Sequence, residues 1–314
     1  MRNIVSVILV LLGFVFVATE TKGQALSRNL PNAFWQAELR EINIAQTQRS
    51  YLLREPTSHL TGSNKPLVIV LHGGGGNAHN AENMSGFSRL VNSKEIYVVY
   101  PNGSGPRENT LLTWNAKHCC GFAMTQNSDD VAFISALIDK LASDYPIDTR
   151  RIYVTGMSNG AMMAHRLGIE LPHKITAIAP VAGTLFGDEQ MPDSAVSALI
   201  INGALDENVP LTGGHSDGLG ARAWDGTPAK PSIFQSEFWA MANNCDTRPV
   251  ETSIGQIHRI RYACQNRSRV EQIIVLDNGH AWPGGQAGRA RAAPPSQSFD
   301  ATEAIWDFFS NQTK

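Results

Sequence analysis

Apolar residues along the chain follow two alternating patterns. Short continuous runs such as PLVIVL, IYVVY and ALIING are typical of strands that are buried on both faces of a sheet. Such runs predict strands at residues 49–53, 66–71, 96–100, 151–155, 175–181, 198–203 and 270–276. Between them, apolar residues recur at the spacing of helices that cover one side of a core. This second pattern predicts helices within residues 82–91 and at residues 131–145, 159–170, 232–243 and 301–309.

The alternation of buried strands with helices predicts an α/β fold, in which a mostly parallel sheet is covered by helices on both faces. Hydrophobic residues make up 42% of the 314 residues and charged residues 17%, so the chain can bury a full core. The sequence shows neither an internal repeat nor a low-complexity linker. We therefore expect residues 24–314 to form a single catalytic domain.

The N-terminus has the pattern of an export signal. Arg2 precedes an apolar run at residues 4–18, which has the length of a signal-peptide core and is short for a membrane span. Small residues suited to cleavage follow at Gly23 and Ala25. We predict a signal peptide at residues 1–23 and a secreted mature protein without stable membrane association. An uncleaved N-terminal anchor is the alternative.

The net charge of the chain bears on whether it binds nucleic acid. The formal net charge is −2, and residues of both signs are scattered along the sequence. A protein that binds nucleic acid usually carries a basic stripe, so we expect no nucleic-acid partner. The sequence makes no prediction of oligomeric state.

The candidate chemistry centres on Ser158, in the segment TGMSNGAMMA. Gly156 and Gly160 flank it in a G-x-S-x-G pattern, with a predicted strand before and a predicted helix after. In this context the pattern is typical of a nucleophile on a sharp strand-to-helix turn. A serine hydroxyl alone is a poor nucleophile, so it needs a base, and the base needs an acid to orient it.

Asp206 and His280 are the candidates for the acid and the base. Each follows a predicted strand, at the end of the sheet where ligands bind in open α/β folds. They also follow Ser158 in the order serine, acid, histidine. The rival acids are Asp193, which precedes its strand, and Glu207, which would point elsewhere. We predict a triad of Ser158, Asp206 and His280.

The reaction also needs N–H donors for the developing oxyanion. The N–H of Asn159, directly after the nucleophile, is one candidate. The second donor is expected in the glycine loop that follows His72, where Gly74 is the first choice and Gly75 the second. We expect His72 itself to hold this loop rather than to act in catalysis.

Several segments together resemble a known family. They are RSYLLREP, LHGGGGN, YPNG, WNAKHCCG, DDVAF, YVTGMSNGAMMAHRL, GALDENVP, NGHAWPGG and ATEAIWDFF, in that order. From about residue 49 to residue 309 the chain resembles the exported esterases grouped as polyhydroxybutyrate depolymerases, feruloyl esterases and acetylxylan esterases. The resemblance implies an α/β-hydrolase fold and a serine ester hydrolase with the same triad. Such a mechanism needs no metal and no organic cofactor.

Four cysteines allow two disulfides in an exported chain. Cys245 and Cys264 flank a strand-like segment, and we predict that they pair. Cys119 and Cys120 are then left to each other. Two free thiols, or a bond from one of them to another cysteine, are the alternatives.

Three tryptophans are candidates for substrate contact. Trp114 and Trp282 lie in motif loops, and Trp224 lies in a glycine-rich segment at residues 211–231, which we expect near the site. Aromatic rings of this kind stack on sugars or phenolic groups, although Trp282 fits equally well as a structural wedge. We favour feruloyl or acetyl esters of plant polysaccharide as substrates, with hydroxybutyrate oligomers as the alternative. A serine peptidase and a non-catalytic binding module are further alternatives on the same fold.

Overall fold

The computed structural model describes residues 39–44, 47–57, 63–216, 221–265, 267–288 and 293–314. Contacts divide the chain into Met1–Ala37 and Glu38–Lys314, and the described residues all belong to the second unit. The predicted signal peptide at residues 1–23 lies outside them. No helix in the described part of the chain combines the length and the apolarity needed to cross a bilayer.

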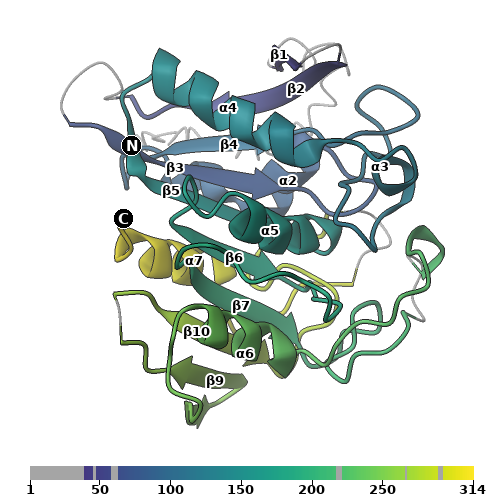
Figure 1. Ribbon diagram of the computed structural model, residues 1–314, viewed down its shortest axis with the longest axis vertical. Coiled ribbons are helices and arrows are strands. Elements are labelled where there is room, and N and C mark those ends of the chain that lie inside the picture. The colour runs from purple at the N-terminus through teal and green to yellow at the C-terminus, as the bar shows by residue number, and fades with distance from the viewer. Residues whose placement is uncertain (1–38, 45–46, 58–62, 217–220, 266, 289–292) are drawn as a thin grey trace, which may run out of the picture. The chain divides into compact units, whose positions relative to one another are not determined.

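One sheet forms the centre of the described unit, with its strands in the order β1-β2-β4-β3-β5-β6-β7-β10-β9-β8 (Figure 1). The six central strands from β4 to β10 pair in parallel, and an antiparallel pair extends the sheet at each edge. The bounds are β1 Arg40–Ile44, β2 Thr47–Arg54, β3 Lys65–Leu71, β4 Tyr97–Pro101, β5 Ile147–Met157, β6 Ala177–Val181, β7 Ser197–Gly203, β8 Val250–Ile254, β9 Ile257–Tyr262 and β10 Val270–Val275.

Helices cover both faces of this sheet (Figure 1). Side chains of α4, α5 and α6 pack into one hydrophobic core, and side chains of α2 and α7 pack into a second core on the opposite face. The bounds are α2 Ala78–Ser85, α3 Gly121–Thr125, α4 Asp130–Asp144, α5 Asn159–Glu170, α6 Ile233–Ala242 and α7 Ala301–Ser310, with short 3₁₀ helices η1 at Phe87–Leu90 and η2 at Ala221–Ala223. The predicted α/β architecture with a mostly parallel sheet is therefore confirmed.

The helix predicted within residues 82–91 was wrong in its bounds. Helix α2 begins earlier, where the Asn77 side chain accepts the Asn80 N–H and caps the first turn. It ends at Ser85 because Gly86 adopts a left-handed φ of 64° and donates its N–H to the Glu82 carbonyl. The remaining residues form the separate helix η1.

Strand β1 was not predicted from the sequence, and the strand-like segment expected between Cys245 and Cys264 is a hairpin of two strands, β8 and β9. Every residue of β8 is exposed, so this strand has no buried apolar run to reveal it. Cys245 and Cys264 are bonded to each other beside the β8–β9 hairpin, as predicted. Cys119 and Cys120 are also bonded to each other.

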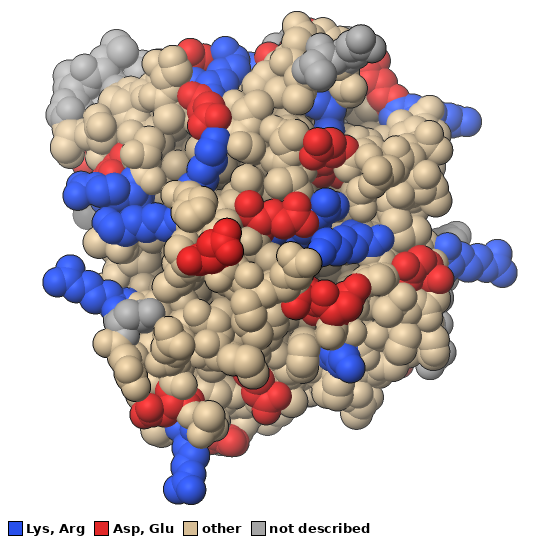
Figure 2. Space-filling model, in the orientation of Figure 1, with Lys and Arg blue, Asp and Glu red and all other residues tan. Residues whose placement is uncertain are grey.

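Charged side chains on the face shown in Figure 2 are mixed in sign. Lys and Arg lie among Asp and Glu, and neither sign forms an extended area on this face. This distribution matches the nearly balanced charge of the sequence.

The Cys245–Cys264 bond should stabilise the fold by lowering the conformational entropy of the unfolded chain. The two residues are 19 positions apart, and closing a loop of this size contributes about 3 kcal/mol in the chain-entropy model. Replacing both by serine should lower the free energy of unfolding in urea by about this amount. Peptide mapping without reduction should yield a linked Cys245–Cys264 peptide. A Cys119–Cys264 peptide would refute the pairing.

Candidate active site

Ser158 makes the turn between β5 and α5 in a conformation that few residues adopt. Strand β5 ends one residue before it, and helix α5 begins one residue after it. Ser158 has φ 58° and ψ −125°, a strained combination that costs about 1–3 kcal/mol in a residue with a side chain. Its N–H donates to the Val181 carbonyl at 2.9 Å, and its carbonyl accepts from Ala161 and Met162. These bonds hold the strained turn in place.

The two glycines that flank Ser158 allow this turn to pack against the end of β3. A Cβ atom on Gly160 would lie 2.5 Å from the His72 carbonyl oxygen and 2.6 Å from that of Leu71. A Cβ atom on Gly156 would lie 2.7 Å from the Gly160 carbonyl oxygen. Backbone atoms cannot give way as a side chain can, so both positions require glycine. The G-x-S-x-G pattern thus reflects a close approach of backbone segments.

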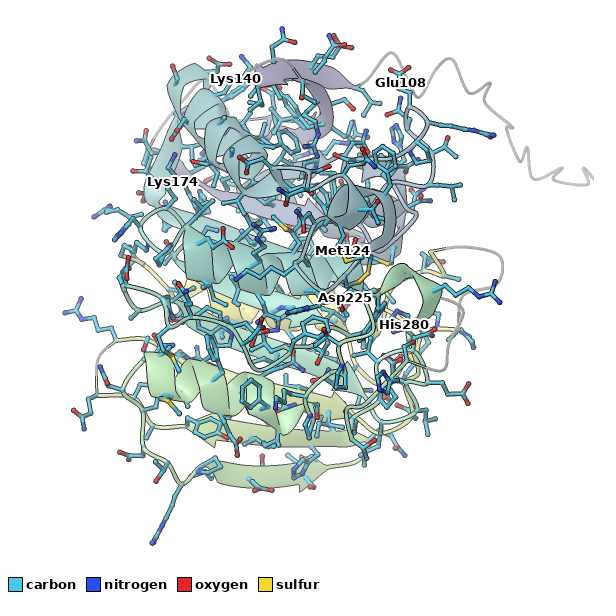
Figure 3. The ribbon with its side chains drawn as sticks, turned by 45° about the vertical axis from the view of Figure 1, so that its right-hand side comes forward. Glu108, Met124, Lys140, Lys174, Asp225 and His280 are labelled. Carbon is cyan, nitrogen blue, oxygen red and sulfur yellow. A yellow bond between two sulfur atoms is a disulfide. The ribbon has the colours of Figure 1, made fainter. Side chains whose placement is uncertain are left out.

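Ser158, His280 and Asp206 form one hydrogen-bonded row. Oγ of Ser158 lies 2.9 Å from Nε2 of His280, and Nδ1 of His280 lies 2.8 Å from Oδ2 of Asp206. The carboxylate accepts the proton on Nδ1, which leaves Nε2 to face the hydroxyl as an acceptor. The three residues follow β5, β7 and β10, and Figure 3 shows His280 among the loops beyond the strand ends. The structure therefore brings together the three residues predicted to form the triad.

The turn after β7 sets the position of the Asp206 carboxylate. Oδ1 accepts the N–H groups of Asn208 at 2.9 Å and Val209 at 2.8 Å, which leaves Oδ2 for the imidazole. Asp206 is buried, whereas the rival acids Glu207 and Asp193 are exposed. Asp206 is thus the carboxylate that meets the histidine.

Asn278, which the sequence analysis did not single out, holds the loop that carries His280. Its side-chain Nδ2 donates to the carbonyls of Gly279 at 2.8 Å and Ala281 at 3.0 Å. Its Oδ1 accepts the Ser296 N–H at 2.9 Å. The N-G-H sequence carried a signal for this role, because asparagine commonly bonds to nearby backbone groups.

His165 is buried in the core and lies outside the row that contains Ser158. The Nε1–H of Trp239 donates to Nδ1 of His165 at 2.9 Å, and Nε2 of His165 lies 2.8 Å from the Gln235 side-chain oxygen. Burial lowers the pKa of His165 to about 4, so this ring stays neutral at physiological pH.

The glycine loop after β3 contains the two residues predicted as the second oxyanion donor, Gly74 and Gly75. The N–H of Gly75 donates to the Leu112 carbonyl at 2.6 Å, so the second-choice donor was wrong. Gly74 lines the same cavity as Ser158, and a Cβ atom placed on it would lie 3.6 Å from the Asn159 Cβ. The two preferred donors, Gly74 and Asn159, are therefore neighbours beside the hydroxyl.

His72 holds this loop from within the core, as expected. Its Nε2 accepts the Gly103 N–H at 2.9 Å, and its Nδ1 lies 2.9 Å from the Gly73 carbonyl oxygen. The ring is fully buried. His72 thus joins the glycine loop to the loop after β4.

The side chain of Asn159 attaches the turn at Ser158 to the loop that carries Trp114. Its Oδ1 accepts the Trp114 N–H at 2.7 Å, and its Nδ2 donates to the Trp114 carbonyl at 2.9 Å. The same Nδ2 lies 3.7 Å from the sulfur of Cys119. The sequence analysis had considered only the backbone of Asn159. The side chain ties the residue after Ser158 to a loop about 45 residues away in the sequence.

Trp114 has no exposed surface to offer a substrate, contrary to the prediction. Its side chain is fully buried, and Nε1 donates to the His72 carbonyl at 3.0 Å. Its ring packs beside those of His72 and Phe133, with centroid distances of 4.9 and 6.5 Å. Trp114 is a core residue beneath the site.

A cavity of about 790 Å³ lies beside Ser158 and His280. Trp224, which is partly exposed, lines this cavity together with Cys120. His280 is the one ionisable side chain among the described residues of its lining. The volume of the cavity is in the range of sites that bind small organic molecules.

Trp282 borders the cavity but offers no exposed face. Its ring is fully buried, its edge meets Phe87, and Nε1 donates to the Thr302 hydroxyl at 3.0 Å. Of the two roles considered for Trp282, its burial favours that of a structural wedge under the His280 loop.

Comparison with known proteins places the chain among esterases. The family model described as esterase PHB depolymerase matches residues 50–247. The protein NocK of Nocardia uniformis subsp. tsuyamanensis, which carries the name of an esterase, is 30% identical over 260 residues, or 78% of this chain and 74% of NocK.

More distant relatives carry names with different substrates. Poly(3-hydroxyalkanoate) depolymerase C of Paucimonas lemoignei is 27% identical over 70% of this chain and 56% of its own length. Feruloyl esterase C of Emericella nidulans is 24% identical over 83% of each chain. Among solved structures, an acetyl xylan esterase from Aspergillus awamori has a TM-score of 0.57 at 14% identity, over 87% of this chain and 99% of that one. At that identity the likeness concerns the fold alone.

Variants of Asn159 test the role of its side-chain amide, because they leave its backbone N–H in place. Asn159→Ala should lower kcat by about tenfold or more, because two buried groups of Trp114 lose partners worth about 1–3 kcal/mol each. Asn159→Asp keeps the size and one acceptor but loses the donor to the Trp114 carbonyl, and we expect it to be no better. The measurement is steady-state hydrolysis of p-nitrophenyl acetate beside thermal unfolding. Full activity in both variants would contradict this role.

Proposed function

The chain belongs to the esterase PHB depolymerase family, and we propose that it is an exported serine carboxylic ester hydrolase. The observation that carries this proposal is the hydrogen-bonded row of Ser158, His280 and Asp206 beside a cavity. Export rests on the sequence of residues 1–23.

Acylation begins when Oγ of Ser158 attacks the ester carbonyl carbon. Nε2 of His280 takes the hydroxyl proton as the new C–O bond forms, and Asp206 stabilises the resulting imidazolium. The tetrahedral intermediate then collapses, the bond to the leaving alcohol breaks, and His280 returns the proton to that alcohol. The product is an ester between the acyl group and Ser158.

Deacylation repeats these steps with water. His280 removes a proton from the water, the hydroxide attacks the acyl carbonyl, and Ser158 leaves with the proton that His280 returns. The acid product then leaves the cavity.

The oxyanion of each intermediate needs N–H donors close to Ser158. The N–H of Asn159 is among the first-turn N–H groups of α5 that have no partner within the helix. We assign this N–H and that of Gly74 to the oxyanion, because both residues line the cavity with Ser158. Removal of one such donor typically costs about 10²–10³ in rate.

Feruloyl or acetyl esters of plant polysaccharide are the favoured substrates. The described lining holds no ionisable side chain apart from His280, which suits an uncharged ester. Trp224 offers a partly exposed ring on which a phenolic acyl group can stack. Hydroxybutyrate oligomers are the second candidate, because the relative from Paucimonas lemoignei is named a poly(3-hydroxyalkanoate) depolymerase.

Triad variants test the mechanism. Ser158→Ala and His280→Ala should abolish hydrolysis of p-nitrophenyl acetate, and Asp206→Asn should lower kcat by about 10⁴-fold because the wrong imidazole tautomer is held. Glu207→Gln is the matched control, since its carboxylate is exposed and adjacent. If Glu207→Gln lost activity while Asp206→Asn kept it, the assignment of the acid would be wrong.

A side-by-side assay of methyl ferulate, acetylated xylan and hydroxybutyrate oligomers tests the substrate. We expect the purified mature chain to release ferulate or acetate in preference to hydroxybutyrate. Hydroxybutyrate release with no activity on the other two would overturn the preferred substrate and leave the mechanism in place. A matched p-nitroanilide tests the peptidase alternative, and cleavage of the anilide without the ester would favour it.

A further inference from the structure

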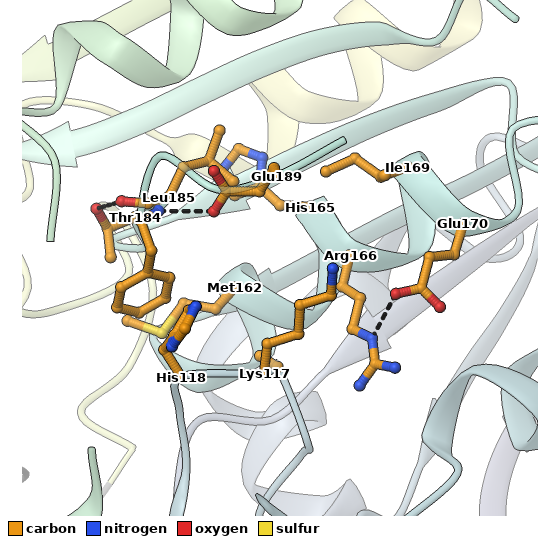
Figure 4. Close-up of a pocket in the computed structure, with 12 residues that line it drawn as sticks. Lys117, His118, Met162, His165, Arg166, Ile169, Glu170, Thr184, Leu185 and Glu189 are labelled. Atoms are coloured by element: carbon orange, nitrogen blue, oxygen red, sulfur yellow. Dashed lines mark hydrogen bonds and ion pairs between the residues drawn. The ribbon is translucent and has the colours of Figure 1, made fainter. Parts of the chain in front are cut away.

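A second, smaller hollow lies beside the candidate site, on the other side of the loop that carries Cys119 and Cys120. Figure 4 shows this hollow, with Lys117 and His118 on one side and Glu189 on another. Cys120 lines the larger cavity, so residues 116–120 separate the two spaces. His118 has no role in the mechanism above, yet each of its two ring nitrogens lies beside a carboxylate.

Both ring nitrogens of His118 meet carboxylates that come from different segments. Nδ1 lies 2.9 Å from Oδ2 of Asp225, and Nε2 lies 2.9 Å from Oδ2 of Asp188. Asp188 belongs to the loop after β6, and Asp225 follows η2. A carboxylate accepts a hydrogen bond and cannot donate one, so both contacts are satisfied together when both nitrogens carry protons.

These contacts join His118 to the segment that carries Trp224. The N–H of Asp225 donates to the His118 carbonyl at 3.1 Å, and Cys119 and Trp224 pair as an antiparallel bridge. The ring of Phe186 lies between the two side chains, 4.9 Å from that of His118 and 5.5 Å from that of Trp224. Residues 222–230, here called the Trp224 segment, therefore rest on His118 through backbone, ionic and aromatic contacts.

The charges around His118 indicate which group titrates. Burial alone would lower the pKa of His118, but hydrogen bonds and charge from Asp188 and Asp225 outweigh it and raise the pKa above its ordinary value. The hydrogen bond from His118 lowers the pKa of Asp188. For Asp225, burial opposes ionisation, but the N–H of Thr227 and His118 together lower its pKa. Both carboxylates therefore stay charged at neutral pH.

Other charged side chains share the hollow with His118. They are Lys117, Arg166, Glu170 and Glu189. Arg166 pairs with Glu170, and Glu189 accepts the N–H groups of Phe186 and Gly187, so these three are engaged with other partners. Lys117 is exposed, and its charge is the smallest of the contributions that lower the pKa of Asp188.

We propose that His118 is a positioning residue for substrate specificity: its protonated ring clamps Asp188 to Asp225 and thereby fixes Trp224 as a wall of the substrate cavity. This inference rests on the proposed function, because Trp224 is a candidate contact for the acyl group. Since the imidazolium forms both bonds, the clamp is complete below the ordinary histidine pKa and is lost as the pH rises through the raised value.

The position of Trp224 can be followed without any assay of activity. In protein labelled with 5-fluorotryptophan, the ¹⁹F resonance that disappears in Trp224→Phe reports this ring. We expect that resonance to shift and broaden in the wild type as the pH rises through the raised His118 value. In His118→Gln it should be broad at every pH, because glutamine cannot pair with both carboxylates as a cation. Lys117→Gln removes a neighbouring exposed charge and should behave as the wild type does.

Selectivity between two esters with one leaving group tests the consequence for the site. In His118→Gln, kcat/KM for p-nitrophenyl ferulate relative to p-nitrophenyl acetate should fall by about tenfold, mainly through KM, as expected for a charge-assisted hydrogen bond. Asp225→Asn should give the same change. In a Trp224→Ala background, His118→Gln should change this ratio no further, because its effect passes through Trp224.

The outcomes separate this inference from the proposed function. An unchanged Trp224 resonance in folded His118→Gln and Asp225→Asn overturns the clamp, whatever the activity. A mobile ring with an unchanged ratio of the two esters overturns the role in specificity. A wild type that hydrolyses neither ester contradicts the proposed function and leaves the resonance test of the clamp intact.

Discussion

The close approach of backbone segments around Gly160 is the constraint on which the site depends. The carbonyl oxygens of His72 and Leu71 occupy the space that a Cβ atom on Gly160 would need. This contact presses the turn at Ser158 against the glycine loop, so that Gly74 and Asn159 line one cavity with the hydroxyl. A larger residue at position 160 would push the turn at Ser158 away from the end of β3, and with it from Gly74, one of the proposed oxyanion donors.

Neighbouring loops are tied to this contact by hydrogen bonds rather than by packing alone. The Asn159 side chain holds both backbone groups of Trp114, and the Trp114 ring donates to the His72 carbonyl. The Leu112 carbonyl accepts from Gly75, which joins the same loop to the glycine loop. The histidine and acid loops have separate supports, and the row from Ser158 to Asp206 links them to this assembly.

The residues of this row were predictable from the sequence, and many of their supports were not. Ser158, Asp206 and His280 each follow a strand with a clear apolar run, and parallel strands end at one edge of a sheet. Gly75 and Trp114 were assigned wrongly because their partners, Leu112 and the His72 carbonyl, lie far away in the sequence. Strands β1 and β8 are the edges of the sheet and β9 lies beside β8, where greater exposure removes the buried pattern that revealed the central strands.

The central claim is that Ser158 is a nucleophile activated by His280, and covalent labelling tests it most directly. The mature protein would be treated with a fluorophosphonate, and the modified peptide would be identified by mass spectrometry in the wild type and in His280→Ala. The account predicts a single adduct on Ser158 that forms far more slowly in the histidine variant. Labelling of another residue, or labelling of Ser158 at the same rate in folded His280→Ala, would contradict it.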